Sequence, residues 1–511
     1  MDKMVKKIII IGGGYGGLAT AMLLAKRGYS VTILEKNSQL GGRVGSIEQD
    51  GFRFDTGPSW YLMPEVFEKF YELFDIDVKN ELQITRLTPG YKVFFEDKGP
   101  VTIQGDITKD ASTFESIEPG AGKKLKKYVK KSEQIYTLSV QDILYTPFLN
   151  LRWLLNKDIF RALPMFASLA TKTLDRYTSR YFKDIRLNQI LQYHSVFLGT
   201  SPYSAPAIYS LMSTLDFNSG VYYPKCGMYS LVESLVMLGE RFGVTYKTDS
   251  EVTQIMIKND QATGVILSSG ETLDADIIIS NADLHFTETR LVGKEHQSYP
   301  ESYWKAKEPS PSAVLVSLGI KGDLPNLLHH NLFFANDWRE NFDAIYKTHS
   351  IPENASLYVC KPSATDKSTA PAGHENIFIL IPLPAHRLLS AEERTTIISR
   401  AIRRLAILAD EPSIASKIVT QHITEPLDFE QQFNAWAYNS LGGQSHILSQ
   451  SAFFRTRNQS KRVKNLYYVG AGTNPGVGLP MCLISAQVVY KIIHSITHQG
   501  PLIKQDFENT K

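Results

Sequence analysis

Short apolar runs that are followed at once by glycine-rich turns stand near both ends of this 511-residue chain. The first run, residues 8–11, consists of four isoleucines, which suits a strand buried on both faces and is too short for a helix. Residues 18–26 then carry apolar side chains three and four positions apart, as an amphipathic helix does. A second strand is predicted over residues 30–34. Strand, turn, helix and strand in this order predict an α/β fold that begins with a Rossmann-type unit.

The turn between the first strand and the helix has the spacing G-x-G-x-x-G, formed by Gly12, Gly14 and Gly17. The first glycine permits the tight turn, the second lets a pyrophosphate approach the backbone, and the third lets the helix pack on the strand. The free N–H groups and the dipole of the helix N-terminus then face the anion. Glu35, followed by Lys36, stands about 20 residues further on, where an acid accepts hydrogen bonds from a ribose. These features predict a site for an adenine dinucleotide.

The residues after Glu35 indicate which dinucleotide is bound. Gly42 and Arg43 bring close backbone and a cation to the same diphosphate. This run resembles the second glycine motif of FAD-dependent amine oxidases and carotenoid desaturases. Residues 55–59 resemble the loop beside the flavin ring in those enzymes, which implies flavin contacts at Gly57, Pro58 and Ser59. Without the resemblance, these residues would indicate an ordinary Gly-Pro turn.

A second strand, glycine turn and apolar helix lie near the C-terminal end. The strand is predicted over residues 466–469, and the helix begins near Leu479 and Pro480, because proline in a first turn costs no hydrogen bond. The pattern alone also allows a second nucleotide site or a plain helix cap, although no acid follows at ribose distance. In the resembled enzymes this turn completes the flavin site, which implies contacts from Gly472, Thr473, Leu479, Pro480 and Met481.

Over nearly its whole length the chain resembles bacterial-type phytoene desaturases, within the FAD-dependent carotenoid desaturases, isomerases and oxygenases. The resemblance implies FAD as cofactor, with the backbone of Val252 beside the adenine. It also implies a glutathione reductase- or amine oxidase-like FAD-binding domain with an interleaved mixed-sheet substrate domain and a helical cap. Two positions depart from the family pattern, Cys226 where glycine is commoner and Asn474 where histidine is frequent.

The length of the chain is too great for one ordinary core and predicts interleaved domains. Strands are expected between Ala313 and Leu383, and a helix from Ser390 to Ala409. We expect three FAD-domain segments (1–80, 226–300 and 456–511), a helical cap over 81–225 and a substrate domain over 301–455.

Composition excludes some functions. The net charge of +3 gives no case for nucleic acid. The three cysteines match no metal-binding spacing, so we expect no metal and a reduced, cytoplasmic chain. No run of about 18 apolar residues predicts a membrane span. Residues 145–182 mix bulky apolar with basic side chains, which suits either peripheral contact with the inner face of the cell membrane or a cap helix with an apolar core face.

The resemblance implies that hydride and proton leave neighbouring carbons of a long apolar polyene, and the chain shows only one complete dinucleotide motif, so quinone or oxygen is the expected electron acceptor. Asp142 and Arg152 are our candidate catalytic residues, because both stand beside apolar residues in the expected substrate region. A charge in apolar surroundings is costly, so such a residue is expected to have a function. His194, His329 and His330 are expected to be satisfied polar groups of the core. A carotenoid oxygenase or ketolase, an isomerase or saturase, and a membrane scaffold that keeps FAD structurally remain alternatives.

Overall fold

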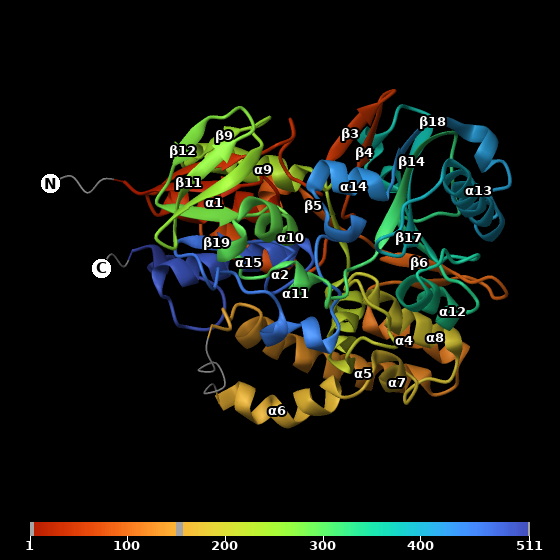
Figure 1. Ribbon diagram of the computed structural model, residues 1–511. Helices are drawn as coiled ribbons and strands as arrows, with labels where there is room; N and C mark the ends of the chain where they lie inside the picture. The colour runs from red at the N-terminus through yellow and green to blue at the C-terminus, as the bar shows by residue number, and fades with distance from the viewer. Residues whose placement is uncertain (1–4, 150–156, 509–511) are drawn as a thin grey trace.

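The protein has three parts, which Figure 1 shows as a parallel sheet with its helices on the left, a second sheet on the right, and a group of helices below both. The computed structural model describes residues 5–149 and 157–508, with only the backbone described for Asp142 and Asp158. Each of the two large sheets draws its strands from distant parts of the sequence, so the parts are interleaved along the chain.

The first sheet has five parallel strands in the order β19-β13-β1-β2-β9. These strands are β1 (Lys7–Ile11), β2 (Ser30–Leu34), β9 (Thr245–Lys247), β13 (Ile277–Ser280) and β19 (Leu466–Tyr468). The four isoleucines of β1 pair with β2 on one side and with β13 on the other. All four are buried, as predicted for a central strand of a doubly covered sheet.

Alternation along β1 divides its side chains between two layers. Ile8 and Ile10 pack with α1 (Tyr15–Lys26), α9 (Ser230–Arg241) and α15 (Leu479–His494). Ile9 and Ile11 face an antiparallel meander of β10 (Val252–Lys258), β11 (Gln261–Leu267) and β12 (Thr272–Asp274). Successive side chains of a strand point to opposite faces, so one run of isoleucines supplies both layers. The α/β, Rossmann-type architecture is confirmed.

The second sheet has seven strands in the order β18-β14-β17-β16-β15-β6-β7 and is mixed, because β15 and β6 are parallel while the other neighbours are antiparallel. Its strands are β6 (Tyr91–Phe94), β7 (Val101–Ile103), β14 (Ser312–Lys321), β15 (His330–Phe333), β16 (Leu357–Cys360), β17 (His374–Leu383) and β18 (Ile418–Thr424). The strands β6 and β7 come from the segment 81–225, which we expected to form a helical cap, and they extend this sheet at its edge.

One face of the mixed sheet carries α13 (Ala391–Leu408), which begins with the predicted Ser390 in a capping box with Glu393. The opposite face packs against the cap helices. The cap helices are α4 (Ile107–Ile117), α5 (Ala121–Leu138), α6 (Lys157–Ala170), α7 (Leu174–Thr178) and α8 (Ile185–Gln192). The contact with the sheet is made mainly by α4, α5 and α8, whereas α6 lies outermost in Figure 1. The predicted cap therefore covers the side of the sheet that faces the dinucleotide unit.

Shorter elements connect the layers. They are β3 (Ser46–Gln49), β4 (Phe52–Asp55), α2 (Pro64–Glu72), α3 (Val78–Leu82), β5 (Ile84–Arg86), β8 (Tyr222–Pro224), α10 (Leu284–Phe286), α11 (Glu301–Trp304), α12 (Trp338–Asp343) and α14 (Pro426–Phe433). None of the described helices combines the length and the apolar character that a bilayer span requires.

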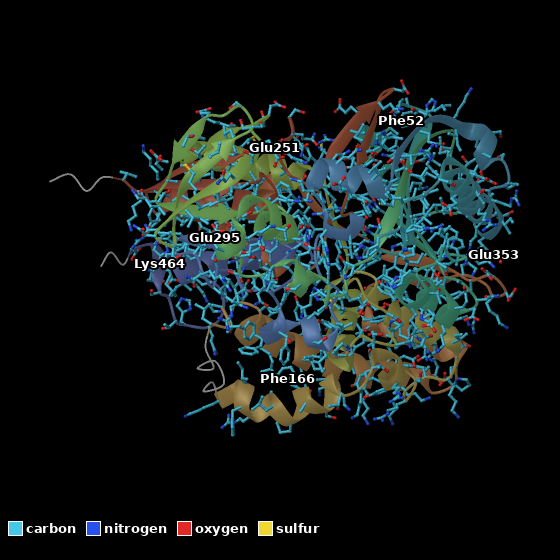
Figure 2. The ribbon with its side chains drawn as sticks, viewed as in Figure 1. Phe52, Phe166, Glu251, Glu295, Glu353 and Lys464 are labelled. Atoms are coloured by element: carbon cyan, nitrogen blue, oxygen red, sulfur yellow. The ribbon has the colours of Figure 1, made fainter. Side chains whose placement is uncertain are left out.

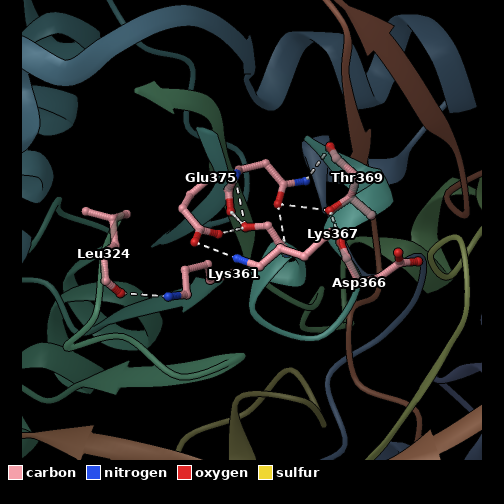
Figure 3. A network of polar contacts seen from close by, with 8 residues as sticks. Leu324, Lys361, Asp366, Lys367, Thr369 and Glu375 are labelled. Atoms are coloured by element: carbon pink, nitrogen blue, oxygen red, sulfur yellow. Dashed lines mark hydrogen bonds and ion pairs between the residues drawn. The ribbon is translucent and has the colours of Figure 1, made fainter. Parts of the chain in front are cut away.

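A buried polar network braces the mixed sheet where β16 ends and β17 begins (Figure 3). Lys361 donates from Nζ to the carbonyl of Leu324 across 2.6 Å. Glu375 accepts from Ser363 and, at 2.9 Å, from Lys367. Because the buried cation and the buried carboxylate both have partners, this end of the sheet is held in one conformation.

Candidate functional site

One continuous cavity of about 920 Å³ extends from the carboxyl edge of the parallel sheet into the cap. At the sheet edge it is lined by the residues that follow the strands, among them Gly12, Glu35, Asn281 and Val469. Ligands of open parallel sheets bind at this edge, where the connections diverge. The cavity thus joins the predicted dinucleotide site to a region of apolar side chains in the cap.

The glycine turn has the geometry that the spacing predicts. Gly12 has a φ of +93°, which favours glycine. A Cβ on Gly14 would lie 2.7 Å from Oδ1 of Asn281, and one on Gly17 would lie 2.5 Å from the carbonyl oxygen of Gly12. The N-cap of α1 is Gly14, which has no side chain to cap the helix. Gly17 N–H donates to Oδ1 of Asn281 at 3.0 Å, and the N–H groups before it remain suited to an anion.

Glu35 is buried at the end of β2, and its carboxylate is held in place by main-chain donors. Gly13 N–H donates to Oε2 across 2.7 Å, and Asn37 N–H donates to Oε1 across 2.9 Å. Lys36 also lines the cavity, but its ammonium group donates to the Gln431 carbonyl at 2.7 Å. Glu35 is therefore oriented for a ribose, whereas the amine of Lys36 ties β2 to the end of α14.

The two glycine motifs touch each other. Gly41 N–H donates to the Gly13 carbonyl across 2.8 Å, and a Cβ on Gly42 would lie 3.2 Å from Cα of Gly14. Arg43 follows, and its guanidinium lies over the ring of Phe433 at 5.3 Å.

Arg43 is a half-buried cation on the wall of the cavity. Desolvation lowers its pKa, and the carboxylate of Asp283 opposes that shift. Its Nε has no hydrogen-bond partner among the described residues. A half-buried cation with a buried, unused donor atom beside two glycine turns fits an anionic diphosphate.

The loop at residues 55–59 is fixed by close contacts. A Cβ on Gly57 would lie 1.8 Å from the carbonyl oxygen of Arg43, so only glycine fits there. The Asp55 carboxylate accepts from Met228 N–H at 2.9 Å. Pro58 and Ser59 line the cavity, and Ser59 Oγ lies 2.7 Å from the Tyr358 hydroxyl. The sequence identified this loop, but the partner on the mixed sheet could not be read from it.

The remaining predicted contacts also converge on the cavity. Its wall includes Val252 with Glu251 beside Glu35, and the C-terminal group Gly472, Thr473, Leu479, Pro480 and Met481. Figure 2 labels Glu251 at the outer end of the parallel-sheet part.

Two residues that we had not assigned a role hold the C-terminal turn. Arg455 is buried and donates from Nε to the Thr473 carbonyl at 3.0 Å and from Nη2 to the Ala471 carbonyl at 2.8 Å. Asn458 donates to the Thr473 hydroxyl at 3.0 Å. Both belong to the stretch 449–458, which supported the family resemblance. The available signal was the group of two arginines and an asparagine that follows the apolar residues 452–454 of this stretch.

The departure at Asn474 also lies on the wall of the cavity. Its side-chain oxygen and nitrogen are both buried and have no hydrogen-bond partner among the described residues. An amide with both groups free can serve a bound polar group, since buried polar atoms normally have partners.

The cap half of the cavity is apolar. Its wall includes Tyr136, Val140, Leu144, Leu163, Phe166, Ile208, Leu211 and Met212. Phe166 lies on the side of α6 that faces the rest of the protein (Figure 2). At its outer end the wall includes Leu448, Phe453 and Phe454, three exposed apolar side chains.

The catalytic candidates stay predictions. The backbone of Asp142 lies in a π-helical turn, Ser139–Ile143, whose residues Ser139, Val140 and Ile143 line the cavity, but the Asp142 side chain is outside the described part. Arg152 lies outside the described residues, as do the neighbouring Trp153, Leu154 and Leu155.

The fold brings Cys360 close to His329 and His330, the two histidines that we expected to be satisfied polar groups of the core. One ring nitrogen of His329, one ring nitrogen of His330 and Sγ of Cys360 all lie within 4.8 Å of one another. Burial lowers the pKa of both imidazoles and raises that of the Cys360 thiol to about 12. The Nδ1 atoms of His329 and His330 have hydroxyl partners, but their Nε2 atoms have none in the described structure. The expectation of satisfied core histidines is met at only one nitrogen of each ring.

Comparison with known proteins places these features in context. Residues 15–489 match the family model of flavin-containing amine oxidoreductases. A carotenoid 3,4-desaturase of Haloarcula japonica is 40% identical, with 95% of this chain and 97% of the relative covered. A zeta-carotene-forming phytoene desaturase of Myxococcus xanthus is 33% identical over 96% and 95%. A 4,4'-diapolycopene oxygenase of a Methylomonas species is 31% identical over 95% and 97%.

Among solved structures, cyclohexylamine oxidase of Brevibacterium oxydans aligns with a TM-score of 0.60 at 15% identity, covering 96% of this chain and all of that one. An oxidoreductase of Methanosarcina mazei gives a TM-score of 0.60 at 17% identity, over 95% of this chain and 100% of that chain. These two alignments concern the fold.

Proposed function

Because the chain belongs to the flavin-containing amine oxidoreductases and, within them, to the carotenoid desaturase family, we propose that it introduces double bonds into phytoene or a shorter, dehydrosqualene-like polyene. The protein is an FAD-dependent oxidoreductase. The continuity of the cavity carries the proposal: the wall that suits a dinucleotide and the apolar wall of the cap enclose one space.

The residues of the dinucleotide half suit FAD in three ways. The N-terminus of α1 offers the N–H groups that precede Gly17, beside the close-packed Gly12 and Gly14. Glu35 offers an oriented carboxylate for the ribose, and Arg43 offers a half-buried cation. When bound, FAD supplies a two-electron acceptor. We assign the loop of Gly57, Pro58 and Ser59 and the turn of Leu479, Pro480 and Met481 to the flavin ring.

The protein would bind and orient the polyene through apolar contact. A hydrocarbon offers no groups for hydrogen bonding, so its affinity rests on the area that it buries against side chains such as Leu163, Phe166 and Leu211. An apolar wall rejects a chain of slightly different length only weakly. We keep Asp142 and Arg152 as proposed catalytic residues of the cap.

We further propose that the outer end of the cavity is where the polyene enters from a membrane surface. Phe160 on α6 is 67% exposed and Phe454 is 59% exposed. Phe454 also lines the cavity, and basic residues such as Arg161 and Lys172 stand on or beside α6. Exposed aromatic and basic side chains together suit the headgroup layer at the inner face of the cell membrane. Quinone or oxygen would reoxidise the cofactor there.

A carotenoid oxygenase is the second candidate, because the diapolycopene oxygenase of Methylomonas is 31% identical over nearly the full length. One experiment distinguishes the two. The chain is expressed in a phytoene-producing host, and the extracted pigments are separated and weighed by mass spectrometry. Loss of hydrogen pairs with longer conjugation supports the desaturase. Added oxygen supports the oxygenase, and an unchanged formula with altered geometry supports an isomerase.

A further inference from the structure

A chain of three hydroxyl and imidazole groups leads from the wall of the cavity into the mixed sheet. Ser59 Oγ lies 2.7 Å from the hydroxyl of Tyr358, and the same hydroxyl lies 2.7 Å from Nδ1 of His330. Ser59 and Tyr358 line the cavity, whereas His330 is fully buried behind them. The chain therefore has one end at the bound molecules and the other end inside the protein.

The three groups stand on elements that hold them in position. Tyr358 is in β16 and His330 is the first residue of β15, and the two strands are paired. Trp60, which also lines the cavity, stacks on the His330 ring with centroids 4.2 Å apart and planes 8° apart. The polar network of Figure 3 holds the neighbouring backbone, because Lys361 N–H donates to the His329 carbonyl at 2.7 Å. The hydrogen-bonded chain is thus preorganised.

Each of the two hydrogen bonds, Ser59–Tyr358 and Tyr358–His330, can have either partner as the donor. In one arrangement Ser59 donates to Tyr358, and Tyr358 donates to Nδ1 of His330, which leaves a Ser59 lone pair toward the cavity. In the other, Nδ1–H of His330 donates to Tyr358, and Tyr358 donates to Ser59. A chain that can reverse all its hydrogen bonds moves a proton from one end to the other without moving a heavy atom.

We propose that Ser59, Tyr358 and His330 form a relay that carries away the proton lost by the polyene when its double bond forms. This inference rests on the proposed desaturase function. FAD, when bound, would supply the oxidant for the hydride that leaves one carbon of the polyene, and the neighbouring carbon would give up a proton to Ser59 Oγ. Ser59 passes its own proton to Tyr358, and Tyr358 passes its own to Nδ1 of His330. The electron pair of the broken C–H bond becomes the second bond between the two carbons.

A weak base is sufficient for this role. Burial and the neighbouring His329 lower the pKa of His330 well below its ordinary value, so the ring is neutral and ready to accept. Burial raises the pKa of Tyr358, which keeps its proton available for transfer. A C–H bond next to a carbon that has lost a hydride is strongly acidic. The stacked Trp60 ring stabilises a transient imidazolium, because the face of an indole attracts a cation.

The first test replaces Tyr358 by phenylalanine, which keeps the ring and removes the relay hydroxyl. Tyr223→Phe is the matched control, since Tyr223 is equally buried, packs on His329 at 4.5 Å and has a hydroxyl with no hydrogen-bond partner in the described structure. We expect Tyr358→Phe to lower kcat roughly 100-fold with KM unchanged, the effect of losing a proton acceptor. The isotope effect for substrate deuterated at the proton-losing carbon should rise, and the control should change neither quantity.

The second readout needs no turnover. The FAD-loaded enzyme, labelled with ¹⁵N in histidine, is compared by NMR without substrate, with the His330 signals identified by their loss in His330→Gln. Tyr358→Phe should shift the Nδ1 resonance of His330, and Tyr223→Phe should leave it unchanged. An unshifted resonance overturns the relay even if the enzyme is a desaturase. A shifted resonance with no desaturated product from the wild type overturns the proposed function instead.

Ser59→Ala breaks the other end of the relay and serves if Tyr358→Phe does not fold. This variant should lower kcat and raise the same isotope effect. It should keep its FAD, which is checked by an unchanged visible absorbance spectrum. If both variants fold, bind FAD and retain the kcat and isotope effect of Tyr223→Phe, the proton leaves by another route and the relay is wrong.

Discussion

Gly13 and Glu35 are joined by a hydrogen bond of 2.7 Å from the backbone N–H of the first to Oε2 of the second. The bond connects the glycine turn after β1 with the acid after β2, and so it fixes the carboxylate relative to the N-terminus of α1, where we propose that the diphosphate binds. The other oxygen, Oε1, accepts from Asn37 N–H at 2.9 Å. Glu35 is thus both an expected ribose contact and a structural tie between the first two loops of the dinucleotide site.

Glu35→Ala removes both functions of that carboxylate. We expect the FAD dissociation constant to rise by about 10- to 100-fold, because a hydrogen bond to a charged group contributes about 1.5–3 kcal/mol. Titration of the apoprotein with FAD, followed by flavin fluorescence, measures the change. Glu48→Ala, at an exposed glutamate on β3, is the control for lost charge. Equal affinities in the two variants would contradict the assigned role of Glu35.

Arg455→Met should loosen the C-terminal turn, because the carbonyls of Ala471 and Thr473 lose their guanidinium donor. Each buried acceptor without a partner costs about 1–3 kcal/mol, so the urea midpoint should fall and FAD should bind more weakly. Arg457→Met removes the same charge two residues away and leaves the backbone bond of Arg457 to Tyr299 intact. If the Arg455 variant is as stable as the Arg457 variant, the turn does not depend on the guanidinium of Arg455 and the prediction is wrong.

The free energy of unfolding should depend on pH through the carboxyl group of Asp55. Desolvation raises its pKa to about 6, although Met228 N–H and Tyr229 N–H oppose the shift. Between the unfolded pKa of about 4 and the folded value, the native state holds a proton that the unfolded state has lost. Raising the pH through this interval therefore lowers the free energy of unfolding, by up to about 3 kcal/mol.

Asp55→Asn should abolish that contribution while it keeps an oxygen for Met228 N–H. Urea unfolding at a series of pH values from 4 to 7 gives the difference between wild type and variant. We expect the wild type to lose stability relative to the variant as the pH rises, and a constant difference would contradict the prediction.

Contact with a membrane surface is expected at the outer end of the cavity. The double variant Phe160→Ser, Phe454→Ser removes two exposed rings there and should reduce sedimentation with anionic liposomes several-fold at unchanged FAD absorbance. The control is Ile407→Ser, Val419→Ser, which removes two equally exposed apolar side chains from α13 and β18 on the mixed sheet. Equal sedimentation of both variants would return α6 to the interpretation as a cap helix with an apolar core face.

Turnover should require an acceptor that takes electrons from the reduced cofactor directly. Product is measured on liposomes without air, with NADP, with a quinone, or with no acceptor. We expect sustained product with the quinone and after admission of air. Sustained product formation with NADP alone would contradict direct transfer to quinone or oxygen. Product formation with no acceptor would indicate an isomerase.

The short-range signals in the sequence were sufficient for the dinucleotide unit. The isoleucines of β1, the glycine spacing and the capping serine of α13 act within a few residues of themselves, so periodicity and turn chemistry identify them. Composition likewise indicated the apolar, basic character of the α6 region. The resemblance to a known family added what spacing could not, namely the expectation of flavin contacts at residues 57–59 and 479–481.

Only the tertiary structure decided which distant groups meet. Ser59 lies 299 residues from Tyr358 in the sequence, and Tyr358 lies 28 residues from His330. Arg455 reaches the turn at Ala471 and Thr473 through a fold that no local pattern encodes. The same holds for β6 and β7, which extend the mixed sheet because β6 pairs with β15 across more than 200 residues. Local propensity determines an element, whereas pairing between elements depends on which apolar faces the whole chain can bury together.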